Sequence, residues 1–286
     1  MSESLSKRHE QLAYTTTADG LLLEGVIVRP PAGAVPSLSF VWIHGNAARF
    51  YDYGYVSICR ALAEAGFPCV SGNTRGHDIA AFVWRGADGR PRPWRSPRDF
   101  PIGAGAGWEA LEDAPLDVAA WVDVAAELSD GVVLVGHSSG AQRVVLYQAQ
   151  RQDPRITGLA LASPDLQGFM PAGELELAQH MVAEGRGQEA VPAQPFAPFY
   201  RQSAAAIVSR ANVLAGVVES AVPAIRCPVL AFYGDLETGA PRLDIASHFS
   251  AAARLDQHTI PGADHAYSAT ESEVAQVLAI WATSLT

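Results

Sequence analysis

The feature that most constrains the fold of this 286-residue chain is a regular alternation of short apolar runs with longer helical patterns. Runs rich in β-branched and aromatic residues indicate strands, and apolar residues that recur every three or four positions indicate helices. Such alternation is typical of a parallel sheet whose strands are joined by crossover helices. We expect strands at residues 11–17, 21–29, 38–44, 68–72, 131–136, 156–162, 228–233 and 257–260, and helices at 54–65, 115–128, 141–150, 241–252 and 271–284.

The first two predicted strands are separated by Ala18-Asp19-Gly20, which suits the tight turn of a hairpin. That pair therefore predicts an antiparallel edge on an otherwise parallel sheet. Apolar residues make up 49% of the chain and charged residues 17%, which is enough to bury a sheet on both faces. The expected class is α/β, with eight strands and helices on both faces.

Two segments interrupt the alternation. Residues 82–108 are rich in Gly, Pro, Arg and Trp, and residues 165–225 carry helical patterns without a strand signal. A structureless loop of either length is uncommon in a compact domain, so we expect each segment to cover part of the core. We divide the chain into a core at residues 1–164 and 226–286 and a helical cap, inserted in the core, at 165–225.

The composition excludes several classes of protein. A formal net charge of −10 argues against a nucleic-acid partner, which requires a basic surface. The cysteines Cys59, Cys69 and Cys227 show no CxxC spacing, so neither a disulfide framework nor a metal site is indicated. Residues 1–11 lack the apolar core of a signal peptide, and no run approaches the ~18 apolar residues of a membrane span. We expect a cytoplasmic protein without stable membrane association.

A candidate nucleophile follows the fifth predicted strand. Residues 136–140, Gly-His-Ser-Ser-Gly, match G-x-S-x-G between a strand pattern and a helix pattern. A sharp strand-to-helix turn of this kind holds the serine in a strained backbone conformation, and its glycines let strand and helix approach closely. Ser138 is therefore the candidate nucleophile. The alternative is a Gly-rich turn that only starts a helix.

A serine hydroxyl is a weak nucleophile at neutral pH and needs a base, which a carboxylate orients. After an elbow of this kind the acid comes next in the chain and the histidine last. The histidines that follow Ser138 are His180, His248, His258 and His265. His265 lies just past the last predicted strand, on a loop at the expected catalytic edge, and is the candidate base. The other three fall in the predicted cap, a helix and a strand.

The carboxylate has two candidates on one loop. Asp235 and Glu237 both follow the predicted strand at residues 228–233. A carboxylate two or three residues past a strand end can reach the imidazole Nδ1 and stabilise the imidazolium that forms during attack. The spacing leaves both residues open.

Stabilising the oxyanion requires two backbone N–H groups, one from the residue after the nucleophile and one from the loop after the third strand. Ser139 supplies the first. Asn46, in His44-Gly45-Asn46-Ala47, supplies the second. We interpret His44 as a structural side chain.

Together these motifs resemble the α/β-hydrolase superfamily. The set, in chain order, is His44-Gly45-Asn46, residues 136–140, residues 234–237 and Asp264-His265. The resemblance covers the chain outside the cap and the Arg-rich segment, and it implies the α/β-hydrolase fold. Asn73-Thr74-Arg75-Gly76-His77 also looks like the Arg-Gly-His turn of the superfamily, which is usually structural.

The resemblance bears on the choice of acid. In many members the strand before the acid ends G-x-x-D, and the corresponding residue here is Glu237. Glutamate departs from the commoner aspartate, and we favour Glu237 over Asp235. Asp165 is a third candidate, because some members carry the acid after that earlier strand.

The two covering segments bear on the substrate. Arginines gather in the first, at Arg85, Arg90, Arg92, Arg95 and Arg98, interleaved with Trp84 and Trp94. They either hold an anionic substrate or pair with surface carboxylates. The cap carries Phe169, Met170, Met181, Phe196, Phe199 and Tyr200, which either roof an acyl pocket or bury the cap on the core.

The resemblance implies a serine hydrolase that cleaves a carboxylic ester of a small or medium-sized substrate through an acyl-enzyme. Its catalytic residues would be Ser138, Glu237 and His265, and it implies no metal or organic cofactor. A thioesterase, a lactonase or a C–C or amide hydrolase would use the same triad. A ligand-binding protein without turnover is the alternative from another class. The sequence leaves the oligomeric state open.

Overall fold

The structure is a computed structural model of the chain. It describes residues 9–31, 36–52, 54–87, 90–91, 102–168, 173–192, 200–237 and 244–286.

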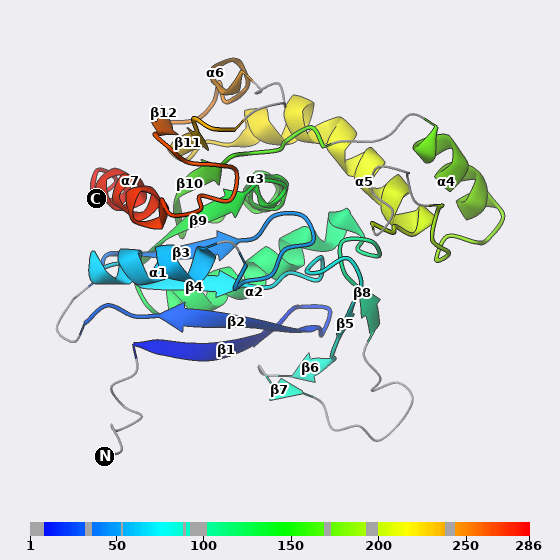
Figure 1. The fold of residues 1–286 in the computed structure, drawn as a ribbon, viewed down its shortest axis with the longest axis horizontal. Helices are drawn as coiled ribbons and strands as arrows, with labels where there is room; N and C mark the ends of the chain where they lie inside the picture. Colours follow the sequence, from blue (N-terminus) through cyan, green and yellow to red (C-terminus); the bar gives the residue numbers. More distant parts are fainter. Residues whose placement is uncertain are drawn as a thin grey trace.

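Eight strands form one sheet in the order β1-β2-β4-β3-β9-β10-β11-β12 (Figure 1). They are β1 (Glu10–Thr16), β2 (Leu22–Val28), β3 (Leu38–Ile43), β4 (Cys69–Gly72), β9 (Gly131–His137), β10 (Ile156–Ala162), β11 (Val229–Gly234) and β12 (Leu255–Ile260). β2 pairs antiparallel with β1 and β4, and the other neighbours are parallel. All eight predicted strands are present with bounds within two residues of the prediction, and the terminal hairpin is confirmed.

Helices cover both faces of the sheet. They are α1 (Tyr55–Glu64), α2 (Ala114–Ala126), α3 (Gly140–Arg151), α6 (Ile245–His248) and α7 (Glu271–Thr283). Successive strand residues point to opposite faces, so Phe40 and Trp42 pack in the core with α1 and α7. Val41 and Ile43 pack in the second core with α2, α3 and α6. This two-sided burial explains why the central strands are almost continuously apolar.

The described part of the segment predicted as a cap is mostly helical. It contains α4 (Glu174–Ala183), α5 (Ala204–Gly216), the π-helix η4 (Val217–Ala221) and the 3₁₀ turn η5 (Val222–Ala224). α4 and α5 pack on one another around Met181 and Ile207, and in Figure 1 they lie beyond one end of the sheet. α5 also contacts the 3₁₀ helix η3 (Leu111–Asp113), which precedes α2.

This segment contains one long apolar helix. Ala204–Ala224 form a helical run of 21 residues with an 18-residue window of mean hydropathy 1.4, which by length and composition could cross a membrane, although polar residues such as Arg210 and Glu219 interrupt it. Length and composition are weak grounds for a membrane span, because helices of soluble proteins meet them too. In this structure the run packs on η3 and α3.

Two further segments differ from the simple alternation. The Arg-rich segment supplies β5 (Ala81–Val83) with β8 (Ile102–Ala104), and β6 (Gly86–Ala87) with β7 (Arg90–Pro91), as two small antiparallel sheets. Its residues Arg92, Trp94, Arg95 and Arg98 lie outside the described residues. The helix predicted at 241–252 is a single turn, α6, because Phe249 leaves helical dihedral angles and buries its ring in the core.

Candidate active site

Ser138 stands at the turn between β9 and α3. Its φ is +53°, in the left-handed region, so the backbone is strained as a nucleophile elbow requires. The flanking glycines are required by close approach. A Cβ on Gly136 would lie 2.6 Å from the carbonyl oxygen of Gly140, and a Cβ on Gly140 would lie 2.4 Å from that of Ile43. The motif thus packs the start of α3 directly against β9 and β3.

His265 and Glu237 form a hydrogen-bonded pair beside this turn. Nδ1 of His265 lies 3.0 Å from Oε2 of Glu237. Oε1 of Glu237 accepts hydrogen bonds from Oγ of Ser163 and from the N–H of Gly234, both at 2.6 Å. Burial opposes ionisation of Glu237, but the bonds from His265, Ser163 and Gly234 outweigh it and lower its pKa below the ordinary value. Glu237 is therefore held as a carboxylate.

The other two candidate acids make different contacts. Oδ1 of Asp235 accepts from the N–H of Gly262 at 2.7 Å, and Oδ1 of Asp165 accepts from the N–H of Gly168 at 2.7 Å. Each of these carboxylates thus fixes a loop. Among the described residues, the carboxylate in contact with the His265 ring is that of Glu237.

A cavity of about 360 Å³ joins the candidate nucleophile and base. Its lining comprises Gly45, Asn46, His137, Ser138, Asp264, His265 and Ala266. The loop after β3, the elbow and the loop after β12 supply these residues. The structure therefore brings three separate motifs to one cavity at the carboxyl ends of parallel strands, where α/β folds bind ligands.

The two candidate oxyanion residues flank the serine. Ser139 follows Ser138 directly, and Asn46, in the loop after β3, lines the same cavity as Ser138. Among the hydrogen bonds between described residues, none uses the backbone N–H of Asn46 or Ser139. Within the described part of the chain, both N–H groups are thus without a protein acceptor.

His137 is a site residue that the sequence did not single out. It is buried, with Nδ1 2.7 Å from the hydroxyl of Tyr55 and Nε2 2.8 Å from the backbone oxygen of His265. Burial and the neighbouring His265 lower its pKa to about 4, so the ring is neutral at pH 7. A neutral His137 with the proton on Nε2 donates to His265 and accepts from Tyr55, which fixes the loop that carries the candidate base.

Ser163 and Tyr267 were also missed. Their oxygens lie 2.6 Å apart, and both residues have positive φ, +44° and +58°. Tyr267 follows His265 by two positions, and Ser163 follows β10, so the pair connects the loop of the base to the carboxylate of Glu237. No pattern in the sequence marks either residue, because their partners lie far away along the chain.

His44 uses both ring nitrogens in local bonds. Nδ1 lies 2.8 Å from the oxygen of Gly45, and Nε2 accepts from the N–H of Thr74 at 2.9 Å. Burial, with the charge of Arg143, lowers the pKa of His44 to about 3. The ring is therefore a neutral spacer between the loops after β3 and β4.

The remaining histidines after Ser138 lie elsewhere. His180 is on α4 beside Glu184, His248 is on α6 and His258 is on β12. Across the described residues, no group of three or more His, Cys, Asp or Glu side chains is placed to hold a metal ion.

Comparison with known proteins identifies the family. A profile of the alpha/beta hydrolase family matches residues 40–279, most of the chain. The chain belongs to the alpha/beta hydrolase family. As in the fold expected of an alpha/beta hydrolase, its sheet is mostly parallel and has eight strands.

Solved structures of several other proteins share this fold. Est1E from Butyrivibrio proteoclasticus is 18% identical with a TM-score of 0.61, over 96% of this chain and 99% of that one. GrgF from Penicillium sp. sh18 is 17% identical with a TM-score of 0.65, over 96% and 97%. The monoacylglycerol lipase of Paleococcus ferrophilus is 18% identical with a TM-score of 0.60, over 88% and 97%. No curated protein sequence matches this alpha/beta hydrolase.

Proposed function

We propose that this alpha/beta hydrolase is a serine hydrolase that cleaves a carboxylic ester of a small or medium-sized substrate. The observation that carries the proposal is the hydrogen-bonded pair of His265 and Glu237, whose histidine lines the same cavity as Ser138. A serine at a strained elbow, a histidine and a buried carboxylate form the constellation that activates a hydroxyl for attack. The monoacylglycerol lipase of Paleococcus ferrophilus, which shares the fold, supports the assignment.

The proposed reaction runs through an acyl-enzyme. His265 takes the proton of the Ser138 hydroxyl as its oxygen attacks the ester carbonyl, and Glu237 stabilises the imidazolium. The N–H groups of Asn46 and Ser139 bind the oxyanion of the tetrahedral intermediate. His265 then protonates the leaving alcohol, and the acyl group stays on Ser138. Water, deprotonated by His265, attacks the acyl-enzyme and releases the acid.

The size of the cavity favours small or medium-sized substrates. Its volume of about 360 Å³ lies near the lower end of the range for small-molecule sites. In our proposal the helices α4 and α5 form a cap over this site, and the hydroxyl of Tyr200 accepts from Nδ2 of Asn46 at 2.8 Å. This contact joins the cap segment to the proposed oxyanion loop.

The same triad cleaves thioesters, lactones, amides and some C–C bonds, so the kind of bond cleaved needs a test of its own. A ligand-binding alpha/beta hydrolase without turnover would carry the same fold. A covalent probe separates the two classes, because only an activated serine reacts with it.

We would test the proposal by intact-mass labelling with a fluorophosphonate on the wild type and on Ser138→Ala. The matched control is Ser247→Ala, which removes an exposed serine of α6 that does not line the cavity. Stoichiometric labelling that Ser138→Ala abolishes and Ser247→Ala retains would support the proposal. A folded wild type that does not label would contradict it.

Parallel assays with p-nitrophenyl esters of graded chain length, and with the corresponding thioesters, test the substrate class. A preference for short acyl chains would agree with the cavity volume. Turnover of thioesters but not of esters would show that the enzyme is a thioesterase and not an ester hydrolase.

A further inference from the structure

A buried carboxylate, Glu109, lies between two arginines from different parts of the chain. Its Oε1 is 2.5 Å from Nη2 of Arg143 on α3 and 3.8 Å from Nη2 of Arg210 on α5. The side chains of Glu109 and Arg143 are 2% and 1% exposed. Burying such charges costs solvation free energy that the pairing only partly returns. The proposed acyl transfer uses none of the three, so their retention requires another explanation.

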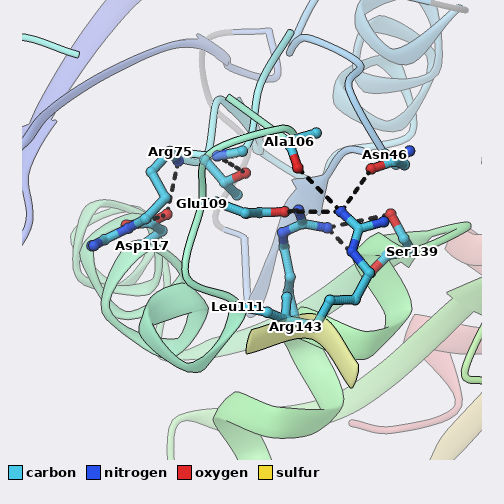
Figure 2. Close-up of polar contacts among 12 residues, drawn as sticks. Asn46, Arg75, Ala106, Glu109, Leu111, Asp117, Ser139 and Arg143 are labelled. Atoms are coloured by element: carbon cyan, nitrogen blue, oxygen red, sulfur yellow. Dashed lines mark hydrogen bonds and ion pairs between the residues drawn. The ribbon is translucent and has the colours of Figure 1, made fainter. Parts of the chain in front are cut away.

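Each arginine contacts one of the two oxyanion residues. Nη1 of Arg143 lies 3.3 Å from both the backbone oxygen and the Oγ of Ser139. Nη2 of Arg210 lies 3.3 Å from Oδ1 of Asn46. Figure 2 shows Glu109 and Arg143 beside Ser139 and Asn46, with the separate pair of Arg75 and Asp117 on the other side. One carboxylate thus links the supports of both proposed donors.

The link reaches the proposed cap. Arg210 also donates to the backbone oxygen of Ala106 at 3.3 Å. Its neighbour Ser209 accepts from the N–H of Leu111 at 2.8 Å and donates to Glu112. α5 is therefore fixed to the segment that carries Glu109. Because Arg210 lies on α5 and contacts Asn46, the position of α5 influences the position of the Asn46 side chain.

We propose that Arg143 and Arg210 are positioning residues that hold Ser139 and Asn46 in place through the shared carboxylate of Glu109, so that docking of α5 completes the oxyanion hole. An oxyanion hole stabilises the transition state only when its donors are fixed before the reaction. Arg143 fixes the donor that follows the nucleophile, and Arg210 fixes the one across the cavity. The inference rests on the proposed function, because only acyl transfer generates the oxyanion.

The main test variant is Arg210→Gln, since Arg210 is less buried than Arg143 and its loss is less damaging to the fold. Glu109→Gln is the second variant, because it keeps the size of the side chain and removes the shared charge. Asp117→Asn is the control. It breaks a comparable buried pair with Arg75 that contacts neither Asn46 nor Ser139.

The readouts are kcat and KM on a p-nitrophenyl ester, and the Kd of a trifluoromethyl ketone compared with that of the product acid. Removing one oxyanion donor costs about 100- to 1,000-fold in kcat, so displacing one should cost about 10- to 100-fold. We expect Arg210→Gln and Glu109→Gln to lower kcat by that factor and to change KM little. Both variants should raise the Kd of the ketone far more than the Kd of the acid. Asp117→Asn should leave the ratio of the two Kd values unchanged.

The outcomes separate the two proposals. A wild type that labels at Ser138 and turns over ester, with Arg210→Gln and Glu109→Gln variants that keep wild-type kcat, would overturn the positioning role alone. The positioning role would also be overturned if the variants raised the Kd of the ketone and of the acid by the same factor, or if Asp117→Asn altered the ratio of the two Kd values to the same extent. A general loss of structure would then explain the effect. A folded wild type without labelling would overturn both.

Discussion

The Nδ1 atom of His265 lies 3.0 Å from Oε2 of Glu237, at the end of a chain of contacts that begins at the β11 turn. The N–H of Gly234 and the Oγ of Ser163 bind the other oxygen of the carboxylate, so only Oε2 is presented to the ring. A Cβ on Gly234 would lie 2.2 Å from the oxygen of Ala263. Glycine at this position therefore allows β11 and the loop of His265 to approach closely enough for the glutamate to reach.

The first prediction concerns the acid. Glu237→Gln should lower kcat by about 1,000- to 10,000-fold, because a neutral amide neither fixes the imidazole tautomer nor stabilises the imidazolium. Steady-state kinetics on a p-nitrophenyl ester would measure the loss.

Asp235→Asn is the matched control, since it changes the neighbouring carboxylate that binds Gly262 instead of His265. We expect its kcat to stay within about threefold of the wild type, because its bond lies outside the proposed triad. The reverse order of the two variants would assign the acid to Asp235.

Much of this fold could be predicted from the sequence, because strand and helix patterns are local. The strands around Phe40 and Val135 are mostly apolar and are buried at every position, since helices cover both faces of the sheet. Ser138 could be located for a related reason. Its elbow is encoded within five neighbouring residues.

The contacts that select and hold Glu237 could not be predicted. The spacing leaves Asp235 and Glu237 equal, and only the direction of each side chain separates them. Ser163 is 74 positions away from Glu237 and looks like an ordinary residue after a strand. The early end of α6 also depends on a tertiary contact, the burial of Phe249. Such long-range packing leaves no periodic signal in a single sequence.

The second prediction concerns Ser163. Ser163→Ala removes a donor to a largely buried carboxylate together with the bond to the hydroxyl of Tyr267, so it should lower the free energy of unfolding by at least about 1.5–3 kcal/mol, the range for one hydrogen bond to a charged group. Urea unfolding at pH 7, followed by tryptophan fluorescence, would measure the change. Ser129→Ala removes a hydroxyl that donates to the neutral backbone oxygen of Gly131 and should cost about half as much. Equal losses would show that the charge of Glu237 adds nothing to the Ser163 bond.

The third prediction concerns the glycines of the elbow. In Gly140→Ala the new methyl group would meet the backbone oxygens of Ile43 and His44, so we expect a loss of about 1–3 kcal/mol and slower fluorophosphonate labelling. Gly216, at the end of α5, has open space around it and a φ of −104°. Gly216→Ala should therefore raise stability by about 0.4–1 kcal/mol and leave labelling unchanged. A Gly140→Ala variant as stable as the wild type would contradict the close packing of β3 and α3.

The last prediction concerns the pH dependence of stability. The pKa of His137 is about 4 in the folded chain, against an ordinary value of 6.5, because the ring is buried beside His265. As pH falls from about 6.5 towards 4, the unfolded state binds a proton that the folded state excludes, so stability decreases across that window. Between pH 7 and pH 5 this histidine alone should cost about 2 kcal/mol. His44, with a folded pKa of about 3, acts in the same direction.

The contribution of His137 can be isolated with His137→Gln, whose amide occupies the position of Nε2 and keeps a donor for the backbone oxygen of His265. Urea unfolding of both proteins at pH 7 and pH 5 gives the comparison. The variant should lose about 2 kcal/mol less than the wild type between the two pH values, whatever its stability at pH 7, because glutamine binds no proton. The difference between the two slopes cancels the other titrating groups, including His44. If the stabilities of the two proteins changed equally with pH, His137 would titrate alike in the folded and unfolded chain. That result would contradict its burial between Tyr55 and the loop of His265.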